Sequence, residues 1–312
     1  MGPLAGVRQV HGARGRLALG GPELVASASG VNQRFPMPAL ILAITIVIGA
    51  IFWWLGLPAL RARRRVAISL EPLPHAWQQW LRDDVPAYPR LPSTLQQRLH
   101  GLIQIFVRQK SFVGCNGLVV TERMKVVIAA NACLLVLNRP GVPRENLYDD
   151  LLSILIYPTP FIVRENHRHA SGLVSEGARV LSGQAWDSRR IILSWEDIEH
   201  APSLGHNVVL HEFAHYLDME DETMDGAPGL ASPAEFREWS TIFWEEYDRL
   251  RANLQAGLPS LIDPYAATAP AEFFAVVTEV FFGRPHELDQ QHPLLYQQLR
   301  KYYRLDPARW ES

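Results

Sequence analysis

The sequence predicts an α+β domain that follows a single membrane-spanning helix. Residues 39–60 carry no charged side chain, which is typical of a helix in lipid. Beyond residue 93, apolar side chains recur every three or four residues in long segments, and this period indicates amphipathic helices. Between residues 151 and 194, short segments are continuously apolar or alternate, as strands do. A few short strands among longer helices indicate the α+β class, with a small sheet packed on a central helix.

The chain is expected to divide into three parts. Residues 1–36 are rich in glycine, alanine and arginine without hydrophobic periodicity, and we expect them to be disordered. Residues 37–66 are expected to form a transmembrane anchor with a basic flank. Residues 67–312 are long enough for one substantial domain. Met1 and Met37 are alternative starts, since Met37 stands directly before the apolar run.

The uncharged run Ala39–Leu60 is long enough to cross a bilayer. As a helix that rises about 1.5 Å per residue, it spans a hydrocarbon core of about 30 Å. Thr45 is its polar side chain, and Trp53 and Trp54 near its end suit a membrane interface. A signal peptide is disfavoured because no small-residue cleavage site is apparent and the arginines follow the run. A buried core helix is disfavoured because the run has no polar face.

The charges on the two sides of this run predict its orientation. The nearest charges before it are Glu23 and Arg34. Four arginines follow it directly: Arg61, Arg63, Arg64 and Arg65. The positive-inside rule then predicts a single pass through the inner (cytoplasmic) membrane, with the domain in the cytoplasm.

The composition of the domain argues against some partners. Eight of the 30 basic residues and one of the 32 acidic residues precede residue 67, which leaves 22 basic and 31 acidic residues and a formal net charge of −9. That balance argues against nucleic acid as a partner. Cys115 and Cys133 lie in apolar neighbourhoods, and we expect them to be buried thiols of a reducing compartment.

The elements of the domain follow from periodicity, in chain order. Ser93–Gln109 is predicted to be a helix with Ser93 as its N-cap, Leu118–Val120 a short strand and Arg123–Leu137 a helix. An extended peptide is expected to pair with the edge of the predicted sheet, along the strand at Arg189–Ser194. The other predicted strands are Leu151–Tyr157 and Ala178–Leu181. The remaining predicted helices are Gly205–Leu217, Pro233–Leu254, Pro270–Phe282 and Pro293–Tyr303.

Residues 211–215 have the sequence HExxH within an apolar stretch that is predicted to be helical. Positions i and i+4 share one helix face, so His211 and His215 can present two imidazole nitrogens to one metal ion. Glu212 is rotated by about 100°, which places it beside the metal as a general base. An ordinary amphipathic helix could contain this pattern by chance, but burying two histidines and a glutamate without a partner is costly. The pattern therefore predicts a zinc peptidase.

A catalytic zinc site needs a third protein ligand. A histidine six residues after His215 would mark one class of zinc peptidase, but that position is Asp221. In the predicted helix that begins at Pro270, Glu272 and Glu279 are the charged residues, and they lie seven apart on one face. Glu272 is the candidate ligand. The alternative is that Glu272 only offsets the helix dipole, since it falls in the first turn.

Two roles around the zinc site stay open from spacing alone. Glu279 and Asp218 are both candidates to hold the N–H group of a ligand histidine. Tyr265 lies seven residues before Glu272. It is either a packing residue or a donor that stabilises the oxyanion of the reaction.

With these segments, the chain resembles the Mlc titration factor A (MtfA) family of zinc-dependent peptidases, from about Trp77 to the C-terminus. The resemblance implies a zincin-like, gluzincin-type metallopeptidase domain with a small sheet packed on the HExxH helix. It implies one zinc ion per chain, held by the equivalents of His211, His215 and Glu272, with Glu212 as the catalytic base. The apolar run departs from the archetypal member, which is soluble. The matching segments occur in the same order: Leu155–Val163, Ser182–Trp186, Ile191–Trp195, His211–Asp218 and Asp263–Val276.

Two functions are compatible with the sequence. The leading one is a membrane-anchored zinc metallopeptidase that hydrolyses peptide or protein substrates with a glutamate-activated water. The alternative, implied by the resemblance, is a binding protein that sequesters a transcriptional regulator of sugar uptake, an Mlc-like repressor, with little or no peptidase role. The intact set of His211, Glu212 and His215 favours catalysis, because a binding module has no need of the glutamate base.

Overall fold

A computed structural model describes residues 37–143, 147–148, 150–168, 174–181, 183–187, 190–204, 206–221 and 223–310. The chain divides into two compact units, Met1–Phe52 and Trp53–Ser312. The expected disorder of residues 1–36 lies outside the described residues. The predicted boundary after residue 66 falls inside a helix of the second unit, so Trp53–Ser312 is described below as the domain.

In the first unit, the described residues form helix α1 (Met37–Ile51), and all of its side chains are exposed. A π-helical turn, η1 (Phe52–Gly56), and helix α2 (Leu57–Ser69) continue the chain without a break. The whole segment Met37–Ser69 is long and apolar enough to cross a membrane. This helix coincides with the predicted anchor, and its apolar composition is the reason that both the sequence and the structure single it out.

Helix α2 is fixed on helix α4 (Ser93–Gln109) by a close backbone approach. A Cβ atom added to Gly101 would lie 2.7 Å from the carbonyl oxygen of Ser69, so the contact requires glycine at that position. Just beyond α2, the Gln104 amide donates a hydrogen bond of 2.7 Å to the carbonyl oxygen of Glu71. The guanidinium of Arg108 forms a two-point ion pair with the Glu71 carboxylate. These contacts attach the end of α2 to α4.

The predicted helix Ser93–Gln109 is confirmed, with one difference at its start. The N-cap is Pro92 rather than Ser93, and no side chain caps this end. Helices α3 (His75–Asp84) and α5 (Glu122–Leu135) pack with it to form the first part of the core. Helix α5 is capped by Thr121, whose hydroxyl accepts a hydrogen bond of 3.2 Å from the Met124 N–H.

A four-stranded sheet lies at the centre of the domain, in the order β1-β2-β6-β5. Strands β1, β2 and β6 are parallel, and β5 runs antiparallel to β6. A separate antiparallel hairpin contains the predicted strand Ala178–Leu181. The sheet consists of β1 (Ser111–Gly114), β2 (Ser153–Tyr157), β6 (Arg190–Ser194) and β5 (Gly183–Asp187), and the hairpin of β3 (Phe161–Arg168) and β4 (Val174–Leu181).

Two strand predictions are wrong. Residues Leu118–Val120 are not a strand, because the chain turns back directly after β1: the Leu118 N–H bonds to the carbonyl of Cys115 at 3.0 Å, and Asn116 and Gly117 have φ of 50° and 80°. The strand at Arg189–Ser194 is not at the edge of the sheet, because β6 pairs with β2 on one side and with β5 on the other. The edge strands of this sheet are β1 and β5.

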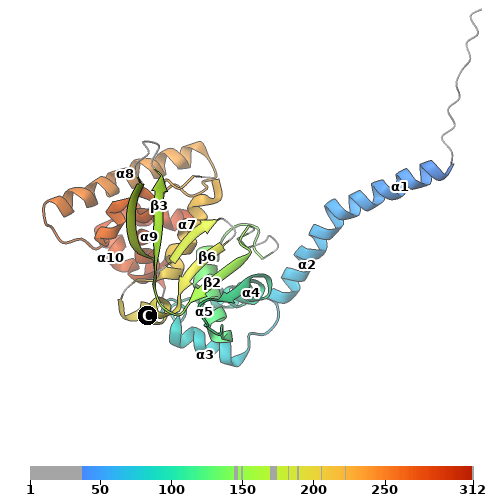
Figure 1. The fold of residues 1–312 in the computed structure, drawn as a ribbon, viewed down its shortest axis with the longest axis horizontal. Helices are drawn as coiled ribbons and strands as arrows, with labels where there is room; N and C mark the ends of the chain where they lie inside the picture. Colours follow the sequence, from blue (N-terminus) through green and yellow to red (C-terminus); the bar gives the residue numbers. More distant parts are fainter. Residues whose placement is uncertain are drawn as a thin grey trace, which may run out of the picture. The chain divides into compact units, whose positions relative to one another are not determined.

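Helix α7 (Val208–Asp218), which contains the HExxH residues, lies between an N-terminal and a C-terminal group of helices. It packs against α5, α9 (Pro270–Gly283), β5 and β6, so the small sheet does contact this helix, as predicted. In Figure 1 the C-terminal helices, drawn in orange to red, gather together, and α3, α4 and α5, drawn in cyan to green, form the other group. The result is a helix-rich mixed fold with a small, mainly parallel sheet.

The remaining helices follow in chain order, and they confirm the predicted helices at 233–254, 270–282 and 293–303 to within one residue. Their apolar faces complete the core around Phe273, Phe274 and Trp239. A helix at Trp195–Leu204 was not predicted. The bounds are α6 (Trp195–Leu204), η2 (Met219–Asp221), α8 (Pro233–Gln255), η3 (Pro264–Thr268), α9 (Pro270–Gly283), α10 (Pro285–Gln291), α11 (Pro293–Tyr303) and η4 (Pro307–Arg309).

Candidate metal centre

His211 and His215 project from the same face of α7, one helical turn apart. The helix begins at Asn207, whose side-chain oxygen accepts a hydrogen bond of 3.1 Å from the Leu210 N–H. The His211 and His215 rings meet edge to face, with their centroids 4.8 Å apart. Their side chains are 13% and 7% exposed, respectively, so both imidazoles are held by packing while one edge of the pair stays accessible.

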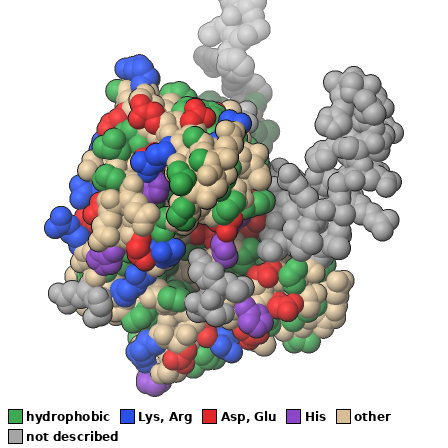
Figure 2. Space-filling model, turned by 90° about the vertical axis from the view of Figure 1, so that its left-hand side faces the viewer, with side chains coloured by type: hydrophobic (Ala, Val, Ile, Leu, Met, Phe, Trp, Pro, Cys, Tyr) green, Lys and Arg blue, Asp and Glu red, His purple; other side chains and the backbone are tan. Residues whose placement is uncertain are grey.

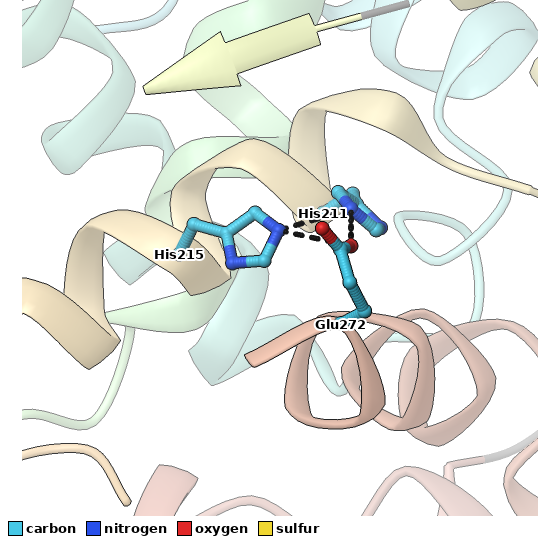
Figure 3. A group of neighbouring side chains, drawn as sticks. All are labelled: His211, His215 and Glu272. Carbon is cyan, nitrogen blue, oxygen red and sulfur yellow. Dashed lines mark hydrogen bonds and ion pairs between the residues drawn. The ribbon is translucent and has the colours of Figure 1, made fainter. Parts of the chain in front are cut away.

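Glu272 reaches this histidine pair from the first turn of α9. Its Oε2 atom lies 3.1 Å from Nε2 of His211 and 3.3 Å from Nε2 of His215. The two Nε2 atoms are 3.1 Å apart. Figure 3 shows the three side chains directed toward one another from the two helices. The structure therefore brings together all three residues that the sequence proposed as metal ligands.

The spacing of these atoms fits a zinc ion. Zinc holds nitrogen and oxygen ligands at about 2.0–2.1 Å in a tetrahedron, so neighbouring ligand atoms lie about 3.3 Å apart. The three separations of 3.1, 3.1 and 3.3 Å are close to this edge length. Two imidazoles and one carboxylate leave a fourth position open, which is the arrangement of catalytic rather than structural zinc sites.

Glu279 holds the opposite side of the His211 ring. Its Oε1 atom is 2.8 Å from Nδ1 of His211, and its Oε2 atom accepts a hydrogen bond of 2.5 Å from the Asn207 N–H. A carboxylate on Nδ1 directs the lone pair of Nε2 toward the ligand position. Asp218, the other candidate, instead accepts a hydrogen bond of 3.1 Å from the Gly226 N–H and so fixes the loop after α7.

The charged groups of the cluster strongly shift one another's pKa values. Burial lowers the pKa of His211, but its hydrogen bonds to Glu272 and Glu279 outweigh burial and raise this pKa to about 10. Burial raises the pKa of Glu272, but hydrogen bonds from His211 and His215 outweigh it, so this pKa falls well below its usual range. Two carboxylates on one imidazole thus favour a cation at this place, whether a proton or a metal ion.

Glu212 and Tyr265 differ in their exposure to solvent: Glu212 is buried and Tyr265 is exposed. Glu212 follows His211 on α7, its side chain is buried, and its charge also raises the pKa of His211. Tyr265 is 45% exposed and lies in the short turn η3, not in α9. Its ring centroid is 6.2 Å from that of His211. The ring of this exposed tyrosine therefore lies beside His211, one of the candidate ligands.

Three residues that support the cluster had no assigned role in the sequence. Asn207 both caps α7 and bonds to Glu279; an asparagine before an apolar helical run is a recognisable cap signal. Asp263 caps η3, where its Oδ1 accepts a hydrogen bond of 2.8 Å from the Tyr265 N–H. Nε2 of His206 lies 3.6 Å from Oδ2 of Asp263. Distances of this kind cannot be read from local spacing.

Comparison with known proteins shows which family the chain belongs to. The chain is 42% identical to an uncharacterized protein of Synechocystis sp. over 271 residues, which cover 85% of this chain and 97% of that protein. It is 34% identical to Mlc titration factor A of Yersinia pestis and of Yersinia pseudotuberculosis over 244 residues, which cover 76% of this chain and 88% of each relative. Residues 59–304 match the model of the glucose-regulated metallopeptidase family M90. The chain therefore belongs to this metallopeptidase family, together with the Mlc titration factor A proteins.

Proposed function

We propose that the protein is a membrane-anchored, zinc-dependent peptidase of the gluzincin type with a zincin-like catalytic domain. His211, His215 and Glu272 hold one zinc ion per chain. The single observation that carries the proposal is the triangle of ligand atoms with edges of 3.1, 3.1 and 3.3 Å. When bound, zinc acts as a Lewis acid that polarises the peptide carbonyl and makes water nucleophilic near neutral pH.

Glu212 is the proposed general base. It is buried next to His211, on the helix that carries both histidines, so its carboxylate is fixed relative to the metal ligands. A carboxylate in that position accepts the proton of the attacking water and passes it to the leaving amine. Because Glu212 is not part of the ligand triangle, its role is separable from metal binding.

Tyr265 is the proposed oxyanion donor, and Glu279 the residue that orients His211. The phenol of Tyr265 is exposed beside the cluster, where it can donate a hydrogen bond to the oxygen that becomes negative during hydrolysis. Glu279 keeps Nε2 of His211 directed at the ligand position through its contact with Nδ1.

The substrate is proposed to be an extended peptide segment. Strand β5 is one of the two edge strands of the sheet, and it packs against α7, so its outer side offers backbone groups next to the helix that carries the proposed ligands. A peptide that pairs with β5 as an added strand would be held by backbone hydrogen bonds, which suit many sequences.

Anchoring in the inner membrane is part of the proposal. The support is the exposed apolar helix of α1 and the four arginines that follow the uncharged run. With the arginines on the cytoplasmic side, the peptidase domain acts in the cytoplasm.

The test is a metal and cleavage analysis of the full-length chain in detergent. Elemental analysis is expected to give one zinc ion per chain, and a peptide library is expected to be cleaved. A chelator should abolish cleavage and added zinc should restore it. A chain that binds no zinc, or a cleavage activity that resists the chelator, would contradict the proposal.

A second function is favoured by the name of the Yersinia relatives, Mlc titration factor A. We propose that a transcriptional regulator binds this chain, either as a substrate or as a sequestered partner. The two cases separate with the Glu212→Gln variant. A sequestered partner binds this variant and stays intact with the wild-type chain, whereas a substrate is cleaved by the wild-type chain alone.

A further inference from the structure

A pocket of about 460 Å³ lies where α2 meets α4, away from the metal centre. This volume is within the range of small-ligand sites. Its walls are unusual in composition, since four of the seven residues are arginines. They are Pro58, Arg61, Arg64, Arg65, Ile68, Arg108 and Gln109. We name it the arginine pocket.

The geometry of α2 explains how these arginines converge. Arg61, Arg64, Arg65 and Ile68 are spaced three and four residues apart, so they lie on one helix face. Arg63 is off this face and does not line the pocket. The contact between α2 and α4 described above then brings the fourth arginine, from the end of α4, to the same place.

The pocket carries a surplus of positive charge. Arg108 is held in place by its ion pair with Glu71. Among the residues that the structure describes, neither Arg61 nor Arg64 has an ion pair, and both are exposed. Figure 2 shows a different pattern on the face it draws, where basic and acidic side chains are interspersed. A pocket lined by the two guanidinium groups of Arg61 and Arg64, which have no ion pair within the described residues, is suited to phosphate, which arginine binds with two parallel hydrogen bonds.

The position in the sequence indicates which phosphate. Arg61 directly follows Leu60, the last residue of the uncharged run, so the pocket begins where the proposed membrane span ends. That is the level of the lipid headgroups. Residues 67–312 carry a formal net charge of −9, so an anionic membrane surface repels the rest of the domain. A local phosphate site offsets this repulsion at one point and fixes which side of the domain faces the bilayer.

We propose that the arginine pocket binds the phosphate headgroup of an anionic phospholipid. The inference rests on the proposed membrane anchor but not on the zinc site. Because α2 is attached to α4 by the close contact at Gly101 and by the Gln104 hydrogen bond, a lipid in this pocket holds the peptidase domain in one orientation at the membrane surface.

The test is native mass spectrometry of the full-length chain in a non-ionic detergent, titrated with dioctanoyl phosphatidylglycerol. Dioctanoyl phosphatidylcholine and inorganic phosphate are the comparison ligands. The wild-type chain is expected to bind one phosphatidylglycerol in a saturable manner, and the other two ligands much more weakly. The double variant Arg61→Gln/Arg64→Gln is expected to bind it about thirtyfold more weakly, from the usual contribution of two arginines near a lipid surface.

The matched control is Arg63→Gln/Arg237→Gln, which removes the same charge from exposed positions outside the pocket. It is expected to bind phosphatidylglycerol as the wild type does. Equal losses in both double variants would show a general charge effect and overturn the site. Inorganic phosphate or phosphatidylcholine that binds as tightly as phosphatidylglycerol would overturn the lipid assignment.

Two readouts keep this result separate from the peptidase proposal. Zinc content and thermal unfolding of the Arg61→Gln/Arg64→Gln variant should match the wild type, since its substitutions are exposed and distant from the cluster. The Glu212→Gln variant should bind phosphatidylglycerol as the wild type does. A chain that binds no zinc but still binds the lipid at these arginines would refute the peptidase alone.

Discussion

At the scale of single residues, His211 is the most constrained side chain of the candidate metal centre. One ring nitrogen contacts Glu279 at 2.8 Å, and the other contacts Glu272 at 3.1 Å. The ring is therefore held in position from both sides, and in the proposed site one carboxylate is a ligand while the other orients the ring. Substitutions can distinguish the roles of Glu272, Glu279 and Glu212.

Glu212→Gln is expected to lower the rate of peptide hydrolysis by about 10²–10⁴-fold, because the amide cannot accept the proton of water. Zinc content should remain at one per chain, since Glu212 is outside the ligand triangle. Glu272→Ala is expected to lose both hydrolysis and zinc. Elemental analysis with a peptide cleavage assay measures both effects. A Glu272→Ala chain with full zinc and full activity would overturn the third-ligand assignment.

Glu279→Gln is expected to weaken zinc affinity by about 10–100-fold while the fold persists, because a neutral amide orients His211 less strongly than a carboxylate. Competition with a zinc chelator measures this affinity. Glu287→Gln on α10 is the control, since Glu287 is a half-exposed acid that pairs with Arg284, away from the ligand triangle. If the two variants retained zinc equally, Glu279 would have no orienting role.

At the scale of elements, contacts at the ends of helices align the helices that carry the site residues. Helix α7 begins at the Asn207 cap, and the N–H of the same residue bonds to Glu279 on α9, so one contact aligns the two helices that supply the ligands. In a similar way, α2 is aligned on α4 by the absence of a side chain at Gly101. Both contacts join segments that are far apart in the sequence.

Gly101→Ala is expected to destabilise the domain by about 1–3 kcal/mol, because the added methyl group meets the backbone of Ser69 and forces α2 away from α4. Gly229→Ala is the matched control, since a Cβ atom there meets nothing within 4 Å. Urea unfolding of the two variants gives the difference. Equal free energies of unfolding of the two variants would show that α2 can move away from α4 without loss of stability.

At the scale of the whole molecule, the chain combines an exposed apolar helix with an acidic catalytic domain. The arginines between them are the basis for the predicted orientation. A reporter fused after Ser312 is expected to be active only if it is of the type that works in the cytoplasm. The full-length chain should fractionate with membranes. Activity of a reporter that requires export, or a fully soluble chain, would contradict the anchor and its orientation but would leave the peptidase proposal intact.

The sequence by itself determined the features that depend on local spacing. Two histidines four residues apart share a face of any helix, so His211 and His215 could be paired from the sequence alone. The uncharged run and the long amphipathic helices are also local patterns, and α8 confirms its prediction to within one residue. The apolar run before Arg61 was visible for the same reason.

The tertiary structure decided the features that join distant segments. Spacing left both Glu279 and Asp218 as candidates, and only the packing of α9 on α7 placed Glu279 on the His211 ring. Likewise, the strand order placed β6 inside the sheet, with β1 and β5 at its edges, and α4 completed the arginine pocket. Local periodicity fixes which face of an element is apolar, but not which other element covers it. Which element covers that face depends on the packing of the whole core, because contacts between residues far apart in the chain form together there.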